Sequence, residues 1–102
     1  MKQITEAAAA LEELGQRLRQ ARLARNDPMA IFAERLGVSE RTVRAMEQGR
    51  PTVHVGAWVQ ALWMLDALEP LSRVLESQES LLDRARRMHE PRRQRASRRR
   101  RP

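Results

Sequence analysis

The sequence predicts an all-α fold of about five helices, followed by a C-terminal helix and a basic tail. Apolar residues recur at three- and four-residue steps in several segments, which places them on one face of a helix. Glycines and prolines stand where such segments would end. Residues 32–49 contain none of the aromatic or β-branched clusters that are typical of strands. The 102 residues, 41% of them hydrophobic, are enough for one compact domain.

The first helix is expected from residue 4 to residue 25, a segment rich in strong helix formers. Its apolar face consists of Leu11, Leu14, Leu18 and Ala21. Pro28 ends this helix, because the residue before a proline is displaced from helical geometry, and it opens a second helix over 28–36. Asp27 is the expected N-cap of that helix. Its inward residues are expected to be Ile31, Phe32 and Leu36.

A short turn separates the second helix from the third. Gly37 suits the left-handed conformation that ends a helix, and Ser39 is a favourable N-cap for a third helix over 40–48. Gly49 ends that helix in the same way. Val43 and Met46 are expected to face the core. The outward side of the helix carries Glu40, Arg41, Arg44 and Ala45.

Residues 56–65 are apolar nearly all the way around a helix, which therefore has to be covered on more than one side. Trp58 and Trp63 lie on different faces of it, so we expect one in the core and the other against a partner subunit or the following helix. Capping-box spacing in the segment Asp-Ala-Leu-Glu, which begins at residue 66, predicts a further helix that runs to about Ser77.

These elements divide the chain into three parts. The first is a domain over residues 1–77, whose later helices are expected to make a dimer. A C-terminal helix over 78–90 follows it. The last part, residues 91–102, has no large apolar side chains to bury in a core and is expected to be a disordered tail.

The net charge of +7 is concentrated in two places. Residues 84–102 contain ten arginines and one acid, and residues 15–50 contain eight arginines and four acids. Two basic segments of this kind predict a polyanionic partner. The arginines of the tail are expected to bind phosphate without sequence preference, with docking to an acidic protein and simple solubility as alternatives. These residues are Arg92, Arg93, Arg95, Arg98, Arg99, Arg100 and Arg101.

Three helices with a glycine-containing turn between the second and third match the helix-turn-helix arrangement. In that arrangement the third helix enters the major groove of DNA and its early residues reach the bases. Arginine offers paired donors to guanine and glutamate accepts from cytosine, so the expected base contacts are Glu40, Arg41, Arg44 and Ala45. The expected contacts to the DNA backbone are Ser39, Thr42, Arg25 and Arg50. A solvated charged face is the alternative interpretation of these side chains.

Residues 14–26 and 32–49 resemble the Xre/Cro family, the lambda-repressor-like DNA-binding domains. The residues that carry the resemblance are Ala33, Gly37, Val38, Ser39, Val43, Glu47 and Gly49. The resemblance implies a lambda-repressor-like bundle in which Arg22 and Glu47 form a structural ion pair. The chain departs from the family at Pro28-Met29, where members usually carry Thr-Gln, so the glutamine's DNA contacts are not assigned to Met29.

Residues 46–75 are similar to the Gly-x-Pro-Thr-Val-x-x-Gly segment of HipB-like regulators. These regulators are commonly antitoxins of HipA-type serine/threonine kinases. The similarity implies a dimer that represses its own operon and binds a toxin kinase.

The sequence gives no support to catalysis or to a cofactor. His54 and His89 have no cysteine or close acidic cluster that would complete a metal site. No catalytic triad arrangement and no Gly-rich phosphate loop is present, so neither an enzyme nor a metal or cofactor is expected. No stretch is apolar enough to span a membrane, and a cytoplasmic, nucleoid-associated location is expected.

The sequence therefore predicts a dimeric, sequence-specific repressor that binds double-stranded DNA. Two rival hypotheses stay open. One is a HipB-like antitoxin, and the other is a histone-like protein that coats nucleic acid without sequence preference.

Overall fold

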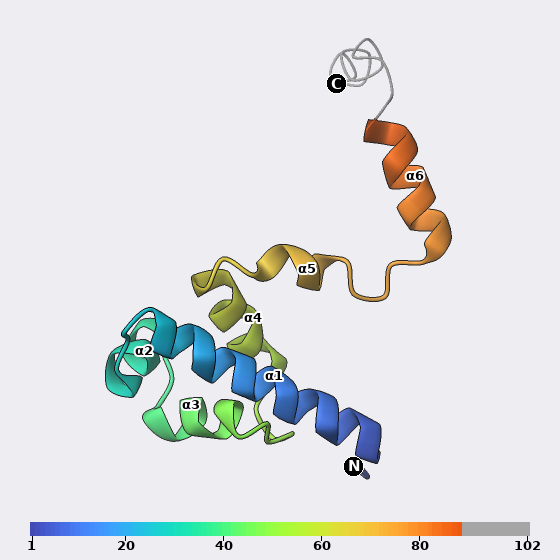
Figure 1. Ribbon diagram of the computed structural model, residues 1–102. Coiled ribbons are helices and arrows are strands. Elements are labelled where there is room, and N and C mark those ends of the chain that lie inside the picture. The colour runs from blue at the N-terminus through green and yellow to red at the C-terminus, as the bar shows by residue number, and fades with distance from the viewer. Residues whose placement is uncertain (89–102) are drawn as a thin grey trace, which may run out of the picture. The chain divides into compact units, whose positions relative to one another are not determined.

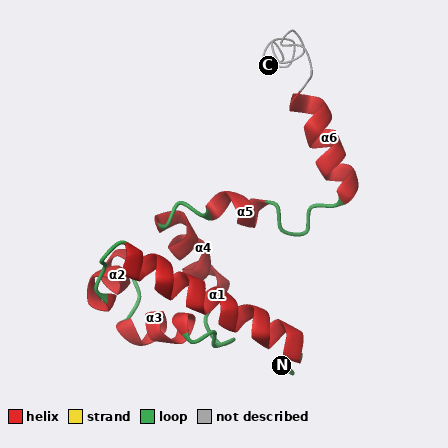
Figure 2. Cartoon of the chain, in the orientation of Figure 1, coloured by secondary structure: helices red, strands yellow, loops and turns green. Residues whose placement is uncertain are grey.

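The computed structural model describes residues 1–88, with the backbone alone for residues 78–81. All regular secondary structure in that range is helical, as Figures 1 and 2 show. The all-α fold predicted from the sequence is therefore confirmed. The predicted tail over 91–102 lies outside the described residues. The helices are α1 (Thr5–Ala24), α2 (Met29–Leu36), α3 (Glu40–Glu47), α4 (Val55–Met64), α5 (Leu68–Ser72) and α6 (Gln78–Met88).

The hydrophobic core lies where the first four helices meet. α3 contacts α1 and α2, and α4 contacts α2, so that α1 passes alongside α3 in Figure 1. Val43 and Met46 are completely buried, which confirms the predicted inward face of α3. The buried residues of the core are Leu18, Phe32, Ala33, Leu36, Val43, Met46, Ala57, Trp58 and Ala61.

The C-terminal end of α3 approaches α1 so closely that both contact positions need glycine. A Cβ atom on Gly15 would lie 2.5 Å from the backbone oxygen of Met46 and 2.7 Å from that of Glu47. Gly49 has a φ of +72°, and a Cβ atom there would lie 2.5 Å from the Cα atom of Glu12. A side chain at either position would force the two backbones apart. The end of α3 is thus held directly against α1.

The start of α2 differs from the prediction in two respects. Pro28 is the N-cap and no side chain caps the helix, so the expected capping role of Asp27 is wrong. Asp27 lies one residue too early for that role, and its carboxylate instead lies 3.4 Å from the guanidinium of Arg35. Ile31, expected inside, is 39% exposed, because this two-turn helix turns Phe32, Ala33 and Leu36 inward.

The segment after α4 also corrects the prediction. Asp66 does not begin a helix: it has a φ of +57°, and its N–H donates to the backbone oxygen of Trp63, which ends α4. The helix expected up to Ser77 is only the five-residue α5, and Leu75, with a φ of +68°, lies in the turns that follow it. Left-handed residues on both sides of α5 explain why this helix is short, since helical geometry cannot pass through them.

The chain separates into two compact units, of which the first ends at Glu69 and the second begins at Pro70. Within the second unit, Arg84 on α6 forms an ion pair with Glu76, with 3.2 Å between Nη2 and Oε1. This pair fixes the segment before α6 to that helix. Several apolar side chains of the second unit are exposed, namely Val74, Leu75, Leu82 and Met88.

Candidate nucleic-acid interface

The turn between α2 and α3 is set by local backbone geometry. Gly37 ends α2 in the left-handed conformation with a φ of +79°, and the N–H of Val38 donates to the backbone oxygen of Ala33. The hydroxyl of Ser39 then caps α3 by accepting from the backbone N–H of Thr42, at 3.1 Å. This sequence of a left-handed glycine and a serine cap is what the residue pattern predicts for a helix-turn-helix.

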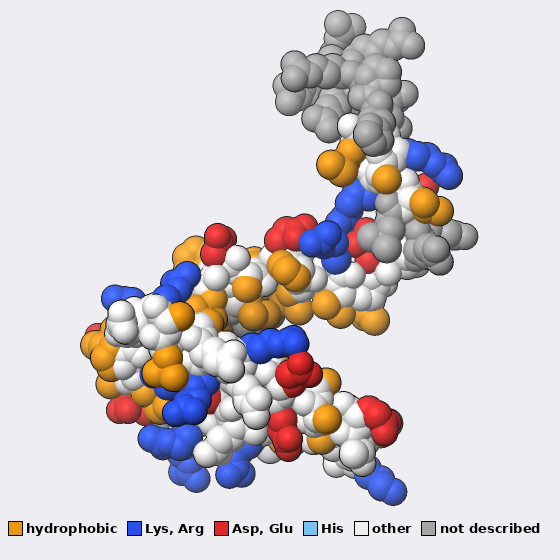
Figure 3. Space-filling view, in the orientation of Figure 1, with side chains coloured by type: hydrophobic (Ala, Val, Ile, Leu, Met, Phe, Trp, Pro, Cys, Tyr) orange, Lys and Arg blue, Asp and Glu red, His pale blue; other side chains and the backbone are white. Residues whose placement is uncertain are grey.

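The two faces of α3 have opposite environments. Val43 and Met46 are fully buried, whereas Glu40, Arg41 and Arg44 are exposed and Ala45 is half-buried. Within the described part of the chain, no hydrogen bond or ion pair engages the guanidinium of Arg41 or of Arg44. Both groups therefore keep their full set of donors for a partner outside the protein. Figure 3 shows Lys and Arg side chains gathered over the α3 side of the first unit.

A buried ion pair joins α1 to the end of α3. Arg22 donates to Glu47 through both arms of its guanidinium, with 2.6 Å from Nε to Oε2 and 3.1 Å from Nη2 to Oε1. Its Nη1 donates to the backbone oxygen of Asp27 at 2.9 Å. The two side chains are only 8% and 6% exposed. The hydrogen bonds that Arg22 donates to the carboxylate of Glu47 raise the pKa of Arg22 above its usual value, so the guanidinium stays charged.

This ion pair also fixes the orientation of α3. Because the pair is bidentate and nearly dry, it holds the C-terminal turn of α3 in one position against α1. Together with the close backbone contact at Gly15, it keeps the arginine-bearing face turned outward.

A hollow of about 430 Å³ opens beside α3. Arg41, Arg44 and Ala45 line it from the helix, and Arg50 and Thr52 line it from the connection to α4. Gln48 also lines it and accepts a hydrogen bond from Nε of Arg50, at 2.9 Å. Three arginines thus line one open depression, and a concentration of positive charge of this kind attracts anions.

A second depression of about 270 Å³ lies against the N-terminal half of α3, lined by Val38, Thr42, Val53 and His54 among others. His54 is the N-cap of α4, because its Nδ1 accepts from the backbone N–H of Ala57 at 3.3 Å. The imidazole thereby caps the start of α4 and also lines this depression.

Gln48, Thr52 and His54 were not among the site residues expected from the sequence. Gln48 follows Arg41 and Arg44 at helical spacing, so it was open to detection on the same face. Thr52 and His54 reach the site only because residues 50–54 fold back along α3. No local pattern in the sequence signals that fold-back.

The expected backbone contacts are not all in one place. Ser39 and Thr42 lie at the start of α3 with their hydroxyl oxygens 3.1 Å apart, and Arg50 lies at the hollow. Arg25 does not line either depression, and its Nη1 donates to the backbone oxygen of Met64 at the end of α4. Met29 is half-buried and packs against the core.

Residues 1–88 contain no cluster of three or more His, Cys, Asp or Glu side chains that would hold a metal ion. None of the helices in that range has the length and apolar character needed to cross a bilayer.

No curated protein and no solved structure shows significant similarity to this chain. The family model described as a helix-turn-helix domain matches residues 13–85. The match covers more than half of the chain and includes both α2 and α3 with the turn between them. The chain belongs to the helix-turn-helix family of DNA-binding domains.

Proposed function

We propose that this protein is a sequence-specific transcriptional regulator that represses by binding double-stranded DNA as a dimer. The observation that supports the proposal most strongly is the outward face of α3. Arg41 and Arg44 are exposed on a helix whose opposite face is fully buried. A helix held in this way fits the major groove, where its outward side chains meet the bases.

Base recognition is assigned to four residues of α3. Arg41 and Arg44 each present two parallel donors that match O6 and N7 of guanine, and Glu40 accepts from N4 of cytosine. Ala45 is small enough for the helix to approach closely and contacts a thymine methyl group. The three-residue spacing of the two arginines puts them on one face, so they read neighbouring base pairs of one half-site.

Contacts to the DNA backbone are assigned to residues at the two ends of α3. Ser39 and Thr42 supply hydroxyl groups at the start of the helix, and Arg50 supplies a guanidinium that Gln48 holds beside the hollow. Arg25 contributes less, because one of its donors is already engaged with Met64. A DNA-bound protein of this kind resides with the nucleoid in the cytoplasm.

The arginines of residues 91–102 are proposed to add affinity without adding sequence choice. Their charge neutralises phosphates and releases counterions, which makes binding depend on salt with a slope of roughly 0.9 per phosphate contact. Deleting residues 91–102 is expected to weaken binding to all duplexes alike and to flatten the salt dependence. Titrations of one specific and one unrelated duplex over a range of salt measure both effects. A change in sequence preference after the deletion would contradict this assignment.

Selection from random duplex DNA tests the proposed function. The expected product is a pair of inverted half-sites with centres about 34 Å apart, one helical turn, as a two-fold symmetric dimer requires. The selected duplex is then competed against bulk DNA at physiological salt. If bulk DNA competes equally well, the protein is a nonspecific, histone-like coating protein and the repressor proposal fails.

A second candidate function is the HipB-like antitoxin that binds a HipA-type kinase toxin. The exposed apolar side chains of the second unit favour it, since Leu75 is 99% exposed and Met88 73% exposed. A kinase-like reading frame beside this gene, with a product that co-purifies with the chain, is the expected result. A kinase that co-purifies equally well after Leu75 and Met88 are changed to serine would count against this surface as the contact.

A further inference from the structure

The face of α4 that points away from the core is apolar, although it lies at the surface. Val55, Val59 and Trp63 follow one another at four-residue steps, so they share one side of the helix. Val55 is 74% exposed and Trp63 69% exposed, and Val59 is half-buried between them. The opposite side of α4, with Ala57, Trp58 and Ala61, is buried in the core. We call the three outward residues the outer α4 face.

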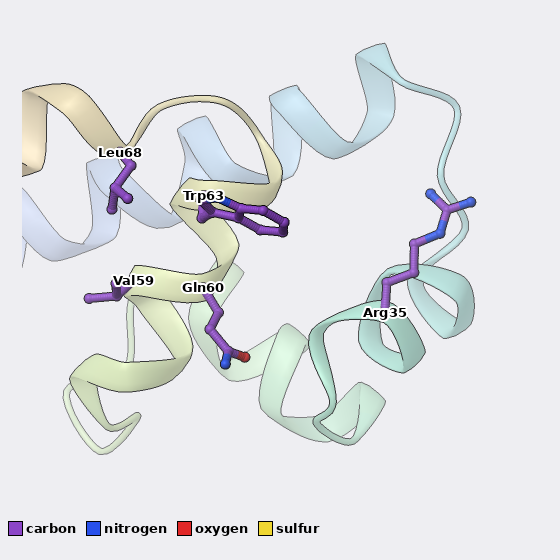
Figure 4. Close-up of a pocket in the computed structure, with 5 residues that line it drawn as sticks. All are labelled: Arg35, Val59, Gln60, Trp63 and Leu68. Carbon is purple, nitrogen blue, oxygen red and sulfur yellow. The ribbon is translucent and has the colours of Figure 1, made fainter.

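A hollow of about 390 Å³ adjoins this face. Val59, Gln60 and Trp63 line it from α4, Leu68 from the segment that follows, and Arg35 from α2. Figure 4 shows these side chains, with the indole ring of Trp63 extending from α4 and Arg35 on the neighbouring helix. The hollow is therefore apolar apart from Gln60 and a cationic rim at Arg35.

Surface tryptophan beside an apolar hollow is typical of a protein contact. A tryptophan side chain carries a large hydrophobic area, and leaving it in water forgoes the free energy of burial. Aromatic residues are also enriched among those that dominate the binding energy of interfaces. The outer α4 face thus has the composition of an interface core.

The charges around the face indicate which partner fits it. Arg35 lies at one edge, with its side chain 62% exposed. Asp66 lies at the end of α4, next to Trp63, because its N–H donates to the backbone oxygen of Trp63 at 3.1 Å; it is exposed. An apolar strip with a cation at one edge and an anion at its end complements a copy of itself after a half-turn, which is the condition for a two-fold interface.

We propose that a second copy of this chain covers the outer α4 face, with Trp63 of each copy seated in the hollow of the other. In this arrangement Arg35 of each copy faces Asp66 of the other. Arg35 keeps its contact with Asp27, which at 3.4 Å uses one of its five donors. The inference rests on the proposed dimeric regulator and identifies the surface that makes the dimer.

Sedimentation of the full chain at graded concentrations tests the apolar part of the interface. The wild-type protein is expected to be a dimer, and Trp63→Ala is expected to weaken its association at least about thirtyfold, the effect of an interface hot spot. Leu23→Ala is the matched control, because Leu23 is a 49% exposed apolar residue of α1. Equal association of the Trp63→Ala and Leu23→Ala proteins would overturn the proposal.

A charge exchange tests the two-fold register. Arg35→Glu places two acids at each contact of a homodimer, and Asp66→Arg places two cations there, so each protein alone is expected to associate at least about tenfold more weakly. A mixture of the two restores an opposite pair at both contacts and is expected to form a heterodimer. A mixture that stays as weak as its components would overturn the register.

Binding to duplexes with one or two half-sites distinguishes a failure of this inference from a failure of the proposed function. The Trp63→Ala protein is expected to bind a duplex with one half-site as tightly as the wild type does, and to lose only the advantage of a second half-site. Equal loss on the one-half-site duplex would overturn the inference, because Trp63 would then act in DNA binding itself. Failure of the wild type to prefer any duplex would instead overturn the proposed function.

Discussion

α3 and α4 each bury one face in the same core and leave the other face outside, but the outward faces are opposite in chemistry. α3 presents Arg41 and Arg44 to the solvent. α4 presents Val55 and Trp63, which are 74% and 69% exposed. A charged face without protein partners is suited to a polyanion, whereas an apolar face is suited to another protein surface. Under the proposed function, α3 makes the contact with DNA and α4 makes the contact with protein.

The comparison also separates stability from binding. Residues on the inward faces hold the fold, so their removal should lower the free energy of unfolding. Residues on the outward faces have few contacts within the chain, so their removal should leave the fold intact and change only its interactions.

The largest expected effect concerns the two tryptophans of α4. Trp58→Ala leaves a cavity in the core and should lower the free energy of unfolding by about 3–5 kcal/mol. Trp63→Ala should change it by no more than about 0.5 kcal/mol at concentrations where the protein is monomeric. Denaturant unfolding of both proteins measures the difference. A comparable loss of stability in the two variants would contradict the division of α4 into an inner and an outer face.

The buried ion pair at the end of α3 is the next test. Arg22→Ala leaves the carboxylate of Glu47 buried without a partner and should cost about 3–5 kcal/mol in the free energy of unfolding. The control is Arg17→Ala, which removes an exposed pair with Glu13 and should cost about 0.5 kcal/mol or less.

A double variant distinguishes the stranded charge from the loss of packing. Replacing Arg22 and Glu47 together with leucine removes both charges, so it should recover much of the stability lost in Arg22→Ala. If the double variant is less stable than Arg22→Ala, the stranded charge is not the main cause of the loss.

The core helices were predictable because their signals are local. Gly37 and Ser39 lie within three residues of each other, and the spacing of Val43 and Met46 identifies the inward face of α3. The bounds predicted for the third helix, 40–48, differ by a single residue from those of α3.

The prediction of a helix up to Ser77 also rested on a local pattern, and it was wrong. Capping-box spacing is a local pattern, but the backbone of Asp66 is used to end the preceding helix. Asp adopts the left-handed conformation more readily than most residues, but its presence does not require it, and a leucine such as Leu75 gives no such signal in the sequence.

Contacts between residues far apart in the sequence could not be predicted from local patterns. Arg22 and Glu47 are 25 residues apart, and only the resemblance to a known family paired them. The hollow beside α3 depends on the path of the connection to α4, which brings Thr52 to the arginines. Such a path is set by the packing of the whole bundle and not by the residues of the connection.

The smallest expected effect on stability concerns the outward face of α3. Arg41→Ala and Arg44→Ala should each remove about 1–3 kcal/mol of discrimination between the selected duplex and a scrambled one. Neither change should lower the free energy of unfolding by more than about 0.5 kcal/mol. Arg19→Ala is the control for loss of one positive charge, because Arg19 is an exposed residue of α1.

The most direct measurement is competition between the selected duplex and the scrambled duplex at physiological salt. It compares the wild type with a double variant in which Arg41 and Arg44 are both changed to alanine. The account predicts a strong preference for the selected duplex in the wild type and in Arg19→Ala, and nearly equal binding of both duplexes in the double variant. A double variant that keeps the wild-type preference would show that another surface reads the sequence, and would contradict the central claim.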